Sequence, residues 1–219
     1  MDELAKAIQK KYIEDITKRY PLHRFFIAFI VIISSYIYST GEHVTLISNL
    51  SNIKINFILD FNKGLLASVN CQQLAISLLA TAVISRLYSK LSNVSFELLS
   101  KASSFDQYIN QIIKKIEDKK SSKEVLNYFL AKDISKELDG LRSKLKSYHT
   151  NAEVSVTFLF CIVWGWSSNS YIDWIVVTLL FAFVIYNLWA SFNYYISDFL
   201  PYYITEQTLL GAKVKFGDM

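Results

Sequence analysis

The 219-residue sequence predicts an all-α integral membrane protein with four transmembrane helices and a long antiparallel cytoplasmic helical hairpin between spans two and three. Hydrophobic residues make up 52% of the chain and charged residues only 19%, against about 25% in soluble domains. The apolar residues gather in four blocks with charged segments between them, and the chain holds only 6 Gly and 2 Pro. These features exclude a disordered chain, a disulfide framework and an ordinary soluble α/β domain.

The four apolar blocks predict spans at residues 22–40, 65–88, 154–168 and 172–195. A helix needs about 20 residues to cross a hydrocarbon core of about 30 Å. The third block is short, and the second is the most polar. A buried helix of a soluble unit is the alternative for the second block, but its length and its lack of charge before Arg86 favour a span.

Ahead of the first span, residues 1–21 predict an amphipathic cytoplasmic helix that ends at Pro21. Its apolar face carries Leu4, Ile8, Tyr12, Ile16 and Tyr20. Such a helix fits two places, the inner surface of the membrane and the side of the cytoplasmic hairpin. The sequence does not decide between them.

The segment 41–64 is expected to form an outer loop with a possible β-hairpin. From Ile53 to Phe61 apolar residues alternate with mainly polar ones, as in a strand, and Val44–Ile47 is a candidate partner.

Residues 89–153 predict the cytoplasmic hairpin. No Gly or Pro occurs between Leu65 and Asp139, so one unbroken helix is expected from Leu65 to Asp118. Ser121 and Glu124 have the spacing of a capping box that starts a second helix. Each helix carries an apolar stripe expected to pack on the other: Leu87, Leu91, Val94, Leu98, Ala102, Phe105, Ile109, Ile112 and Ile116 on the first, and Leu126, Leu130, Ile134, Leu138, Leu141, Leu145 and Tyr148 on the second.

The orientation follows from the basic residues. Six of the 23 Lys and Arg lie in residues 1–24, thirteen lie between Arg86 and Glu153, and two lie in the tail 196–219. Because cytoplasmic segments carry the excess of Lys and Arg, both termini and the hairpin are expected in the cytoplasm.

The second span carries a polar stripe formed by Asn70, Gln73, Ser77, Thr81 and Ser85. A polar face within a membrane must meet protein or water. Hydrogen bonding between helices, in a bundle or an oligomer, is the favoured interpretation. The alternative is that the stripe lines a pore.

Five lysines near the expected hairpin tip are candidates for binding a partner: Lys114, Lys115, Lys119, Lys120 and Lys123. A solvated helical turn explains them more simply. No aromatic residue alternates with them, so direct nucleic-acid binding is not expected.

Chemical motifs are missing from the sequence. It contains no metalloprotease, phosphate-loop, serine-hydrolase or CxxC motif, and His23, His43 and His149 are scattered, so no catalytic residue, cofactor or metal is expected. Cys71 and Cys161 are both expected within the membrane as free thiols, and whether they lie close together stays open.

The four blocks, the basic hairpin 89–153 and the absence of a catalytic motif resemble, in layout, the membrane component of the bacterial anti-phage system Kiwa. The resemblance implies a homo-oligomer, a tetramer, in the inner membrane that responds to phage infection with a soluble DNA-binding partner. The function expected is a non-enzymatic sensor or scaffold that couples the lipid bilayer to a soluble cytoplasmic protein. An ion channel or membrane-perturbing effector, lined by the polar face of the second span, is the alternative. An accessory protein of an immunity-type or intramembrane enzyme is a third class.

Overall fold

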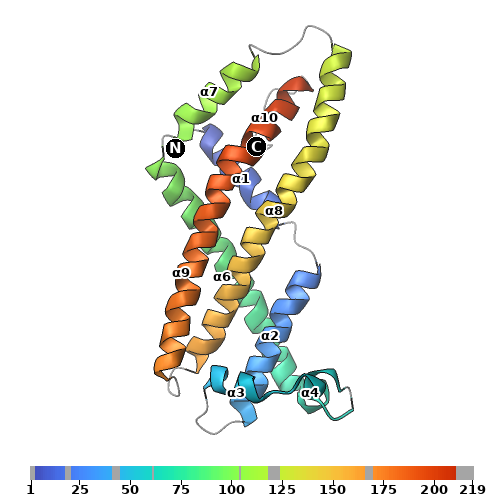
Figure 1. Ribbon diagram of the computed structural model, residues 1–219, viewed down its shortest axis with the longest axis vertical. Coiled ribbons are helices and arrows are strands. Elements are labelled where there is room, and N and C mark those ends of the chain that lie inside the picture. Colours follow the sequence, from blue (N-terminus) through green and yellow to red (C-terminus); the bar gives the residue numbers. More distant parts are fainter. Residues whose placement is uncertain are drawn as a thin grey trace. The chain divides into compact units, whose positions relative to one another are not determined.

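The structure, a computed structural model, describes residues 3–17, 21–40, 45–60, 62–103, 105–117, 124–165 and 170–210. Within these ranges the chain is helical and contains no strand. The helices are α1 (Glu3–Thr17), α2 (Pro21–Thr40), α3 (Leu46–Asn52), α4 (Ile55–Leu59), α5 (Leu65–Ser68), α6 (Cys71–Ala102), α7 (Phe105–Glu117), α8 (Glu124–Trp164), α9 (Tyr171–Tyr194) and α10 (Leu200–Leu209), with a π-helical turn at Tyr195–Phe199 before α10 (Figure 1).

The chain divides into two compact units, which are described separately. Unit 1 comprises Met1–Lys18, Ser89–His149 and Asn187–Met219. Unit 2 comprises Arg19–Tyr88 and Thr150–Tyr186.

Three helical runs are long and apolar enough to cross a membrane: His23–Thr40, Cys71–Ala102 and Tyr171–Leu209. The first and second runs overlap the first and second apolar blocks of the sequence, and the third run contains the fourth block. Residues 154–164 of the third block form the end of α8, a helix of 41 residues that is about 60 Å long. The fold is therefore all-α and consistent with a membrane protein, as the sequence predicts.

The expected unbroken helix from Leu65 to Asp118 is wrong, because the helix is interrupted twice. α5 ends at Ser68, and α6 begins at Cys71 behind a capping box. The side chain of Asn70 accepts from the backbone N–H of Gln73 at 2.8 Å, and that of Gln73 accepts from the N–H of Asn70 at 2.9 Å. The second break follows Ala102, where two serines, which favour turns over helix interiors, precede α7.

The possible β-hairpin in the outer loop is also wrong, since the loop forms the short helices α3 and α4. Thr45 caps α3 by accepting from the backbone N–H of Ser48 at 3.2 Å. Leu46 is fully buried in the core of unit 2, so a short helix buries an apolar anchor that an isolated hairpin would leave exposed. Val44 and Phe61 lie outside the described residues.

The core of unit 2 forms where α2, α6 and α8 pack together. Its buried apolar side chains come mainly from α2, with Ile84 from α6 and Cys161 and Ile162 from α8. Leu78, Leu79 and Val83 on the opposite side of α6 are between 51% and 67% exposed, as the lipid-facing side of a span would be.

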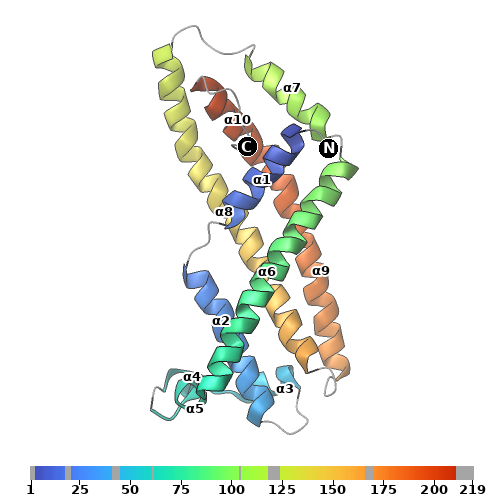
Figure 2. The same ribbon diagram turned by 180° about the vertical axis from the view of Figure 1, so that it is seen from behind.

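The core of unit 1 is an aromatic cluster around the N-terminal helix. The ring centroid of Tyr12 lies 4.6 Å from that of Phe96 and 4.8 Å from that of Tyr195. Ile8 is fully buried in the same core, with Ile109 of α7 and Leu145 of α8. The apolar face of α1 therefore packs on the helices of the hairpin segment, and both views place α1 beside α7 and α10 (Figures 1 and 2).

The apolar stripes expected on the hairpin are buried only in part. Phe105 and Ile109 are buried, but Leu91, Val94 and Leu98 are between 40% and 63% exposed. α6 buries a neighbouring face instead, with Tyr88, Ser92 and Phe96, because the break after Ala102 lets α6 and α7 bury different faces. On α8 the stripe is buried at Leu138 and Leu145 and exposed at Leu126 and Leu130. The expected cap residue Ser121 lies outside the described residues, and the antiparallel hairpin itself stays a prediction.

A π-helical turn joins α9 to α10. The backbone N–H of Leu200 donates to the carbonyl of Tyr195, five residues earlier. Pro201 explains the wider turn, because its ring collides with the carbonyl four residues back and it has no N–H to donate. The helical run thus continues to Leu209, so the first part of the expected tail 196–219 is helical.

Alanine substitutions at two glycines should have opposite effects on the free energy of unfolding. Gly140 lies inside α8, where a Cβ meets nothing within 4 Å, so Gly140→Ala should raise the free energy of unfolding by about 1 kcal/mol. At Gly64 a Cβ would collide with the backbone carbonyls of Phe57 and Asp60, so Gly64→Ala should lower it. Thermal unfolding in detergent micelles measures both shifts, and shifts of the same sign contradict the packing.

Candidate functional site

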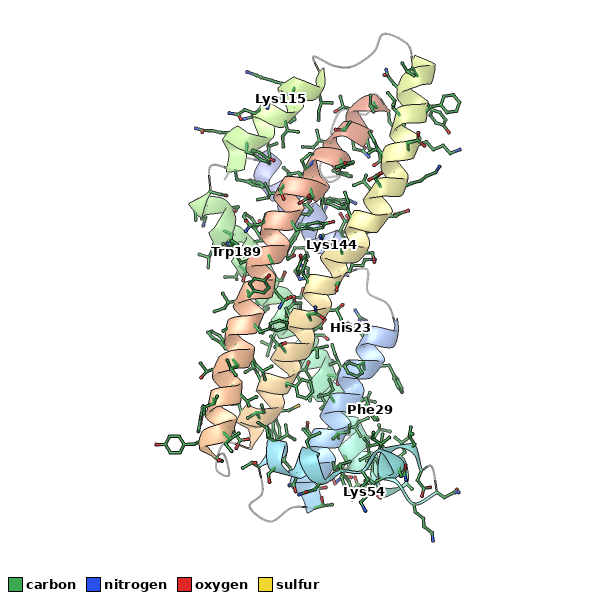
Figure 3. The ribbon with its side chains drawn as sticks, viewed as in Figure 1. His23, Phe29, Lys54, Lys115, Lys144 and Trp189 are labelled. Carbon is green, nitrogen blue, oxygen red and sulfur yellow. The ribbon has the colours of Figure 1, made fainter. Side chains whose placement is uncertain are left out.

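A buried carboxylate joins three helices of unit 2. Glu153 of α8 is 1% exposed, and its Oε2 lies 2.9 Å from Nε2 of His23 at the start of α2. The hydroxyl of Ser85 on α6 donates to the other carboxylate oxygen at 2.9 Å. Figure 3 shows His23 near the start of α2. Since an ionised carboxylate only accepts, the imidazole N–H is the donor.

The electrostatics explain why these residue types occur together. A buried carboxylate is very costly without partners, and an imidazole N–H with a hydroxyl satisfies its two oxygens. His23 is also the first residue of the candidate span His23–Thr40. The cluster of His23, Ser85 and Glu153, called here the carboxylate cluster, therefore holds one end of that span against α6 and α8.

The polar stripe of the second span faces its own unit. Gln73 donates to the hydroxyl of Ser39 on α2 at 2.7 Å, and Ser85 reaches Glu153 on α8. Thr81 donates to the carbonyl of Ser77 at 2.8 Å, and Asn70 caps α6. Ser77 is fully buried, and its hydroxyl has no hydrogen-bond partner among the described residues. The contacts are those of hydrogen bonding between helices of one chain. That copies of the chain share this stripe stays a prediction.

The lysines expected at the hairpin tip are described only in part. Lys114 and Lys115 lie in the last turn of α7 and are exposed, and Lys115 extends away from the helix in Figure 3. Lys119, Lys120 and Lys123 lie outside the described residues.

A second polar network is buried in unit 1. The hydroxyl of Tyr12 lies 2.7 Å from Nε2 of His149 and 3.0 Å from the hydroxyl of Ser191, which itself lies 2.7 Å from the same imidazole nitrogen. Burial raises the pKa of Tyr12 well above its usual range. The network therefore joins α1 to α8 and α9 through a neutral phenol.

A hydroxyl beside an imidazole is also the pair that nucleophilic catalysis uses. Here Ser191 is fully buried, and the Tyr12 hydroxyl shares the imidazole nitrogen that a nucleophile would need to itself. The arrangement fits structural hydrogen bonding. Among the described residues no group of three His, Cys, Asp or Glu side chains could hold a metal ion.

An acidic group at the end of α1 contacts two cations. Asp15 is 2% exposed, and its Oδ1 lies 3.5 Å from Nζ of Lys11 and 3.4 Å from Nε of Arg142. Its other oxygen has no partner among the described residues. Burial raises the pKa of Asp15, and the attraction of Lys11 and Arg142 only partly offsets this.

Sequence reasoning missed the carboxylate cluster and the Tyr12 network. One signal was available for the first: His23 lies at the start of the first expected span and Glu153 directly precedes the third, so both lie at the same expected end of their spans. No comparable signal links Tyr12 to His149 and Ser191, because they are far apart in the sequence. Cys71 is exposed and Cys161 buried, and both are free thiols, as expected.

Comparison of the chain with family models, with curated proteins and with solved structures finds no match.

Substitutions at the two ionisable residues of the carboxylate cluster should lower the free energy of unfolding by unequal amounts. His23→Ala removes the imidazole partner of a buried carboxylate and should lower the free energy of unfolding by about 3 kcal/mol. Glu153→Gln keeps an oxygen that can accept from Ser85, so it should cost only about 1 kcal/mol.

Unfolding in detergent micelles measures both costs, with Arg24→Ala as the control, because Arg24 is exposed beside His23. The control should shift the free energy of unfolding by less than about 0.5 kcal/mol. Equal costs for His23→Ala and Glu153→Gln would show that Glu153 is not held as an ion.

Asp15 predicts a pH dependence of stability. Because its folded pKa is raised, the stability that it contributes is fully present below its unfolded pKa of about 3.9 and is lost as the pH rises through the folded pKa. The melting temperature of the wild type minus that of Asp15→Asn should therefore fall as the pH rises above about 4. A difference that rises with pH would mean that Lys11 and Arg142 outweigh burial.

Proposed function

We propose that the protein is a non-enzymatic, oligomeric subunit of the bacterial inner membrane that acts as a sensor or scaffold. Unit 1 lies in the cytoplasm with both termini and docks a soluble protein there. The resemblance to the membrane component of Kiwa supports a role in anti-phage defence. The proposal has three parts: the number of spans, a docking surface and a contact between copies.

The number of spans in the proposal is four, with residues 154–164 of α8 as the third. Within unit 2 one face of this part of α8 is covered, with Ser155, Thr157 and Ile162 at most 5% exposed. A span covered by other helices can carry more polar residues than one that faces lipid, which explains its modest hydropathy. An even number of spans returns the chain to the side where 21 of its 23 basic residues are expected.

The observation that carries the proposed docking role is an exposed apolar patch at the start of α8. Leu126, Tyr128, Phe129 and Leu130 are between 45% and 58% exposed. They belong to the cytoplasmic segment by the distribution of basic residues, so lipid does not cover them. Adjacent large apolar side chains in water mark a protein-binding surface. Two of the four are aromatic, the kind of side chain that anchors protein interfaces.

The contact between copies is assigned to α6. Leu91, Val94 and Leu98 form an exposed apolar row one helical turn apart, outside the buried face of the same helix. A helix whose two faces are both apolar requires a second partner for the face that its own unit leaves open.

An ion channel lined by the second span is the second candidate. The chemistry of the polar stripe favours it, since its residues are uncharged and carry hydroxyl or amide groups. Against it, Gln73 and Ser85 are already bonded to α2 and α8 of the same chain. The structure thus supports the sensor or scaffold ahead of the channel.

Co-expression with the proteins encoded by neighbouring genes tests the proposal. A soluble companion should co-purify in a fixed ratio with the wild type, and the double variant Leu126→Ser, Phe129→Ser should reduce its recovery at least tenfold, the effect of losing two interface anchors. Lys136→Ser, an exposed change on the same helix, is the control and should leave recovery unchanged. Absence of a companion, together with ion flux through reconstituted protein, would favour the channel.

A further inference from the structure

Unit 2 contains a cavity, partly open to the outside, that the proposed function does not use. Its volume is about 260 Å³, and residues of α2, α6 and α8 line it. An engineered cavity of about 150 Å³ is large enough to hold benzene. The cavity therefore has room for a single ring with a substituent.

The lining of the cavity combines apolar and hydroxyl groups and carries no charge. Aromatic side chains come from Tyr38, Phe160 and Trp164, and aliphatic ones from Val31, Ile76 and Ala80. Serine hydroxyls and the thiol of Cys161 supply the polar part. Without a charged wall the cavity offers nothing to neutralise an ion, so a neutral molecule with an apolar body fits it best.

One fully buried hydroxyl in this wall has no hydrogen-bond partner, whereas the hydroxyl of Ser35, also unpaired among the described residues, is only partly buried. The hydroxyl of Ser34 donates to the carbonyl of Ile30 at 2.8 Å, and that of Tyr38 donates to the carbonyl of Cys161 at 2.8 Å. Ser39 is bonded to Gln73 and to the carbonyl of Tyr36. Ser77 alone is fully buried with a hydroxyl that has no partner among the described residues.

The unpaired hydroxyl of Ser77 differs from the other buried and half-buried hydroxyls in the same unit. Thr81, Ser155 and Thr157 each donate to the carbonyl four residues earlier in their own helix, between 2.8 and 2.9 Å. Ser77 makes no such bond, although it has the same choice. A buried hydroxyl without a partner costs about 1–3 kcal/mol, so a hydrogen-bonding occupant of the cavity would recover that loss.

We propose that this cavity binds a small neutral amphipath, a single ring or short alkyl body with one hydroxyl or carbonyl group, and that the group bonds to Ser77. The aromatic walls cover the body of the ligand, and the hydroxyl of Ser77 sets its orientation. The inference is independent of the proposed function, because it concerns the spans and not the docking surface.

Binding of phenol and of toluene to the purified protein in detergent micelles tests the proposal. The two probes match in ring size, and only phenol has a hydroxyl. We expect phenol to bind about fivefold more tightly than toluene, which is the effect of one net hydrogen bond. Ser77→Ala should abolish this preference while leaving toluene binding unchanged.

Two leucine substitutions on α6 distinguish binding of a probe in the cavity from its uptake by the detergent micelle. Ala80 lines the cavity, so Ala80→Leu should remove the binding of both probes. Ala82 lies on the exposed side of the same helix, so Ala82→Leu should bind both as the wild type does. Equal affinity of the wild type for the two probes overturns the proposal. So does the absence of binding, the result expected if ordered water or a lipid acyl chain fills the cavity.

Discussion

The carboxylate of Glu153 is the group on which the packing of unit 2 depends. It is buried at the point where α8 meets α2 and α6, and each of those helices supplies one hydrogen-bond donor to it. A buried charge is stable only with its partners in place, so the two donors fix the positions of three helices at once. The polar stripe of α6 follows from the same constraint: its side chains point where partners exist, and the opposite side of the helix is left apolar for lipid.

Unit 1 satisfies its buried polar groups in a different way. A phenol, an imidazole and a hydroxyl form a hydrogen-bonded triangle, and aromatic rings surround it. This network makes the N-terminal helix part of the core of unit 1. A body held together in this way can present Tyr128 and Phe129 to a partner on a rigid helix, which is what a docking surface needs. The large apolar side chains that remain exposed are therefore more informative about function than the buried ones.

The elements that the sequence predicts well are those that depend on a long pattern. Three of the four apolar blocks correspond to candidate spans, and the face with Ile8 and Tyr12 predicts the amphipathic N-terminal helix. The features that the sequence does not predict depend on single contacts. The break at Asn70 comes from one capping box, and the Asn70–Gln73 spacing is a local signal for it within a stretch that has no Gly or Pro. The buried face of α6 and the pairing of His23 with Glu153 are set by tertiary packing, and no local pattern encodes either.

Labelling with a membrane-impermeant maleimide tests the central claim, that unit 1 is a cytoplasmic docking body and the stripe of α6 is internal. Single cysteines at Phe129 and at Ser77 are introduced into a chain with Cys71→Ser and Cys161→Ser. In inverted membrane vesicles the cysteine at 129 should be labelled, in right-side-out vesicles it should not, and the cysteine at 77 should be labelled in neither. Labelling at 77 would show a water-filled path along α6, and labelling at 129 from the outside would reverse the orientation; either result contradicts the account.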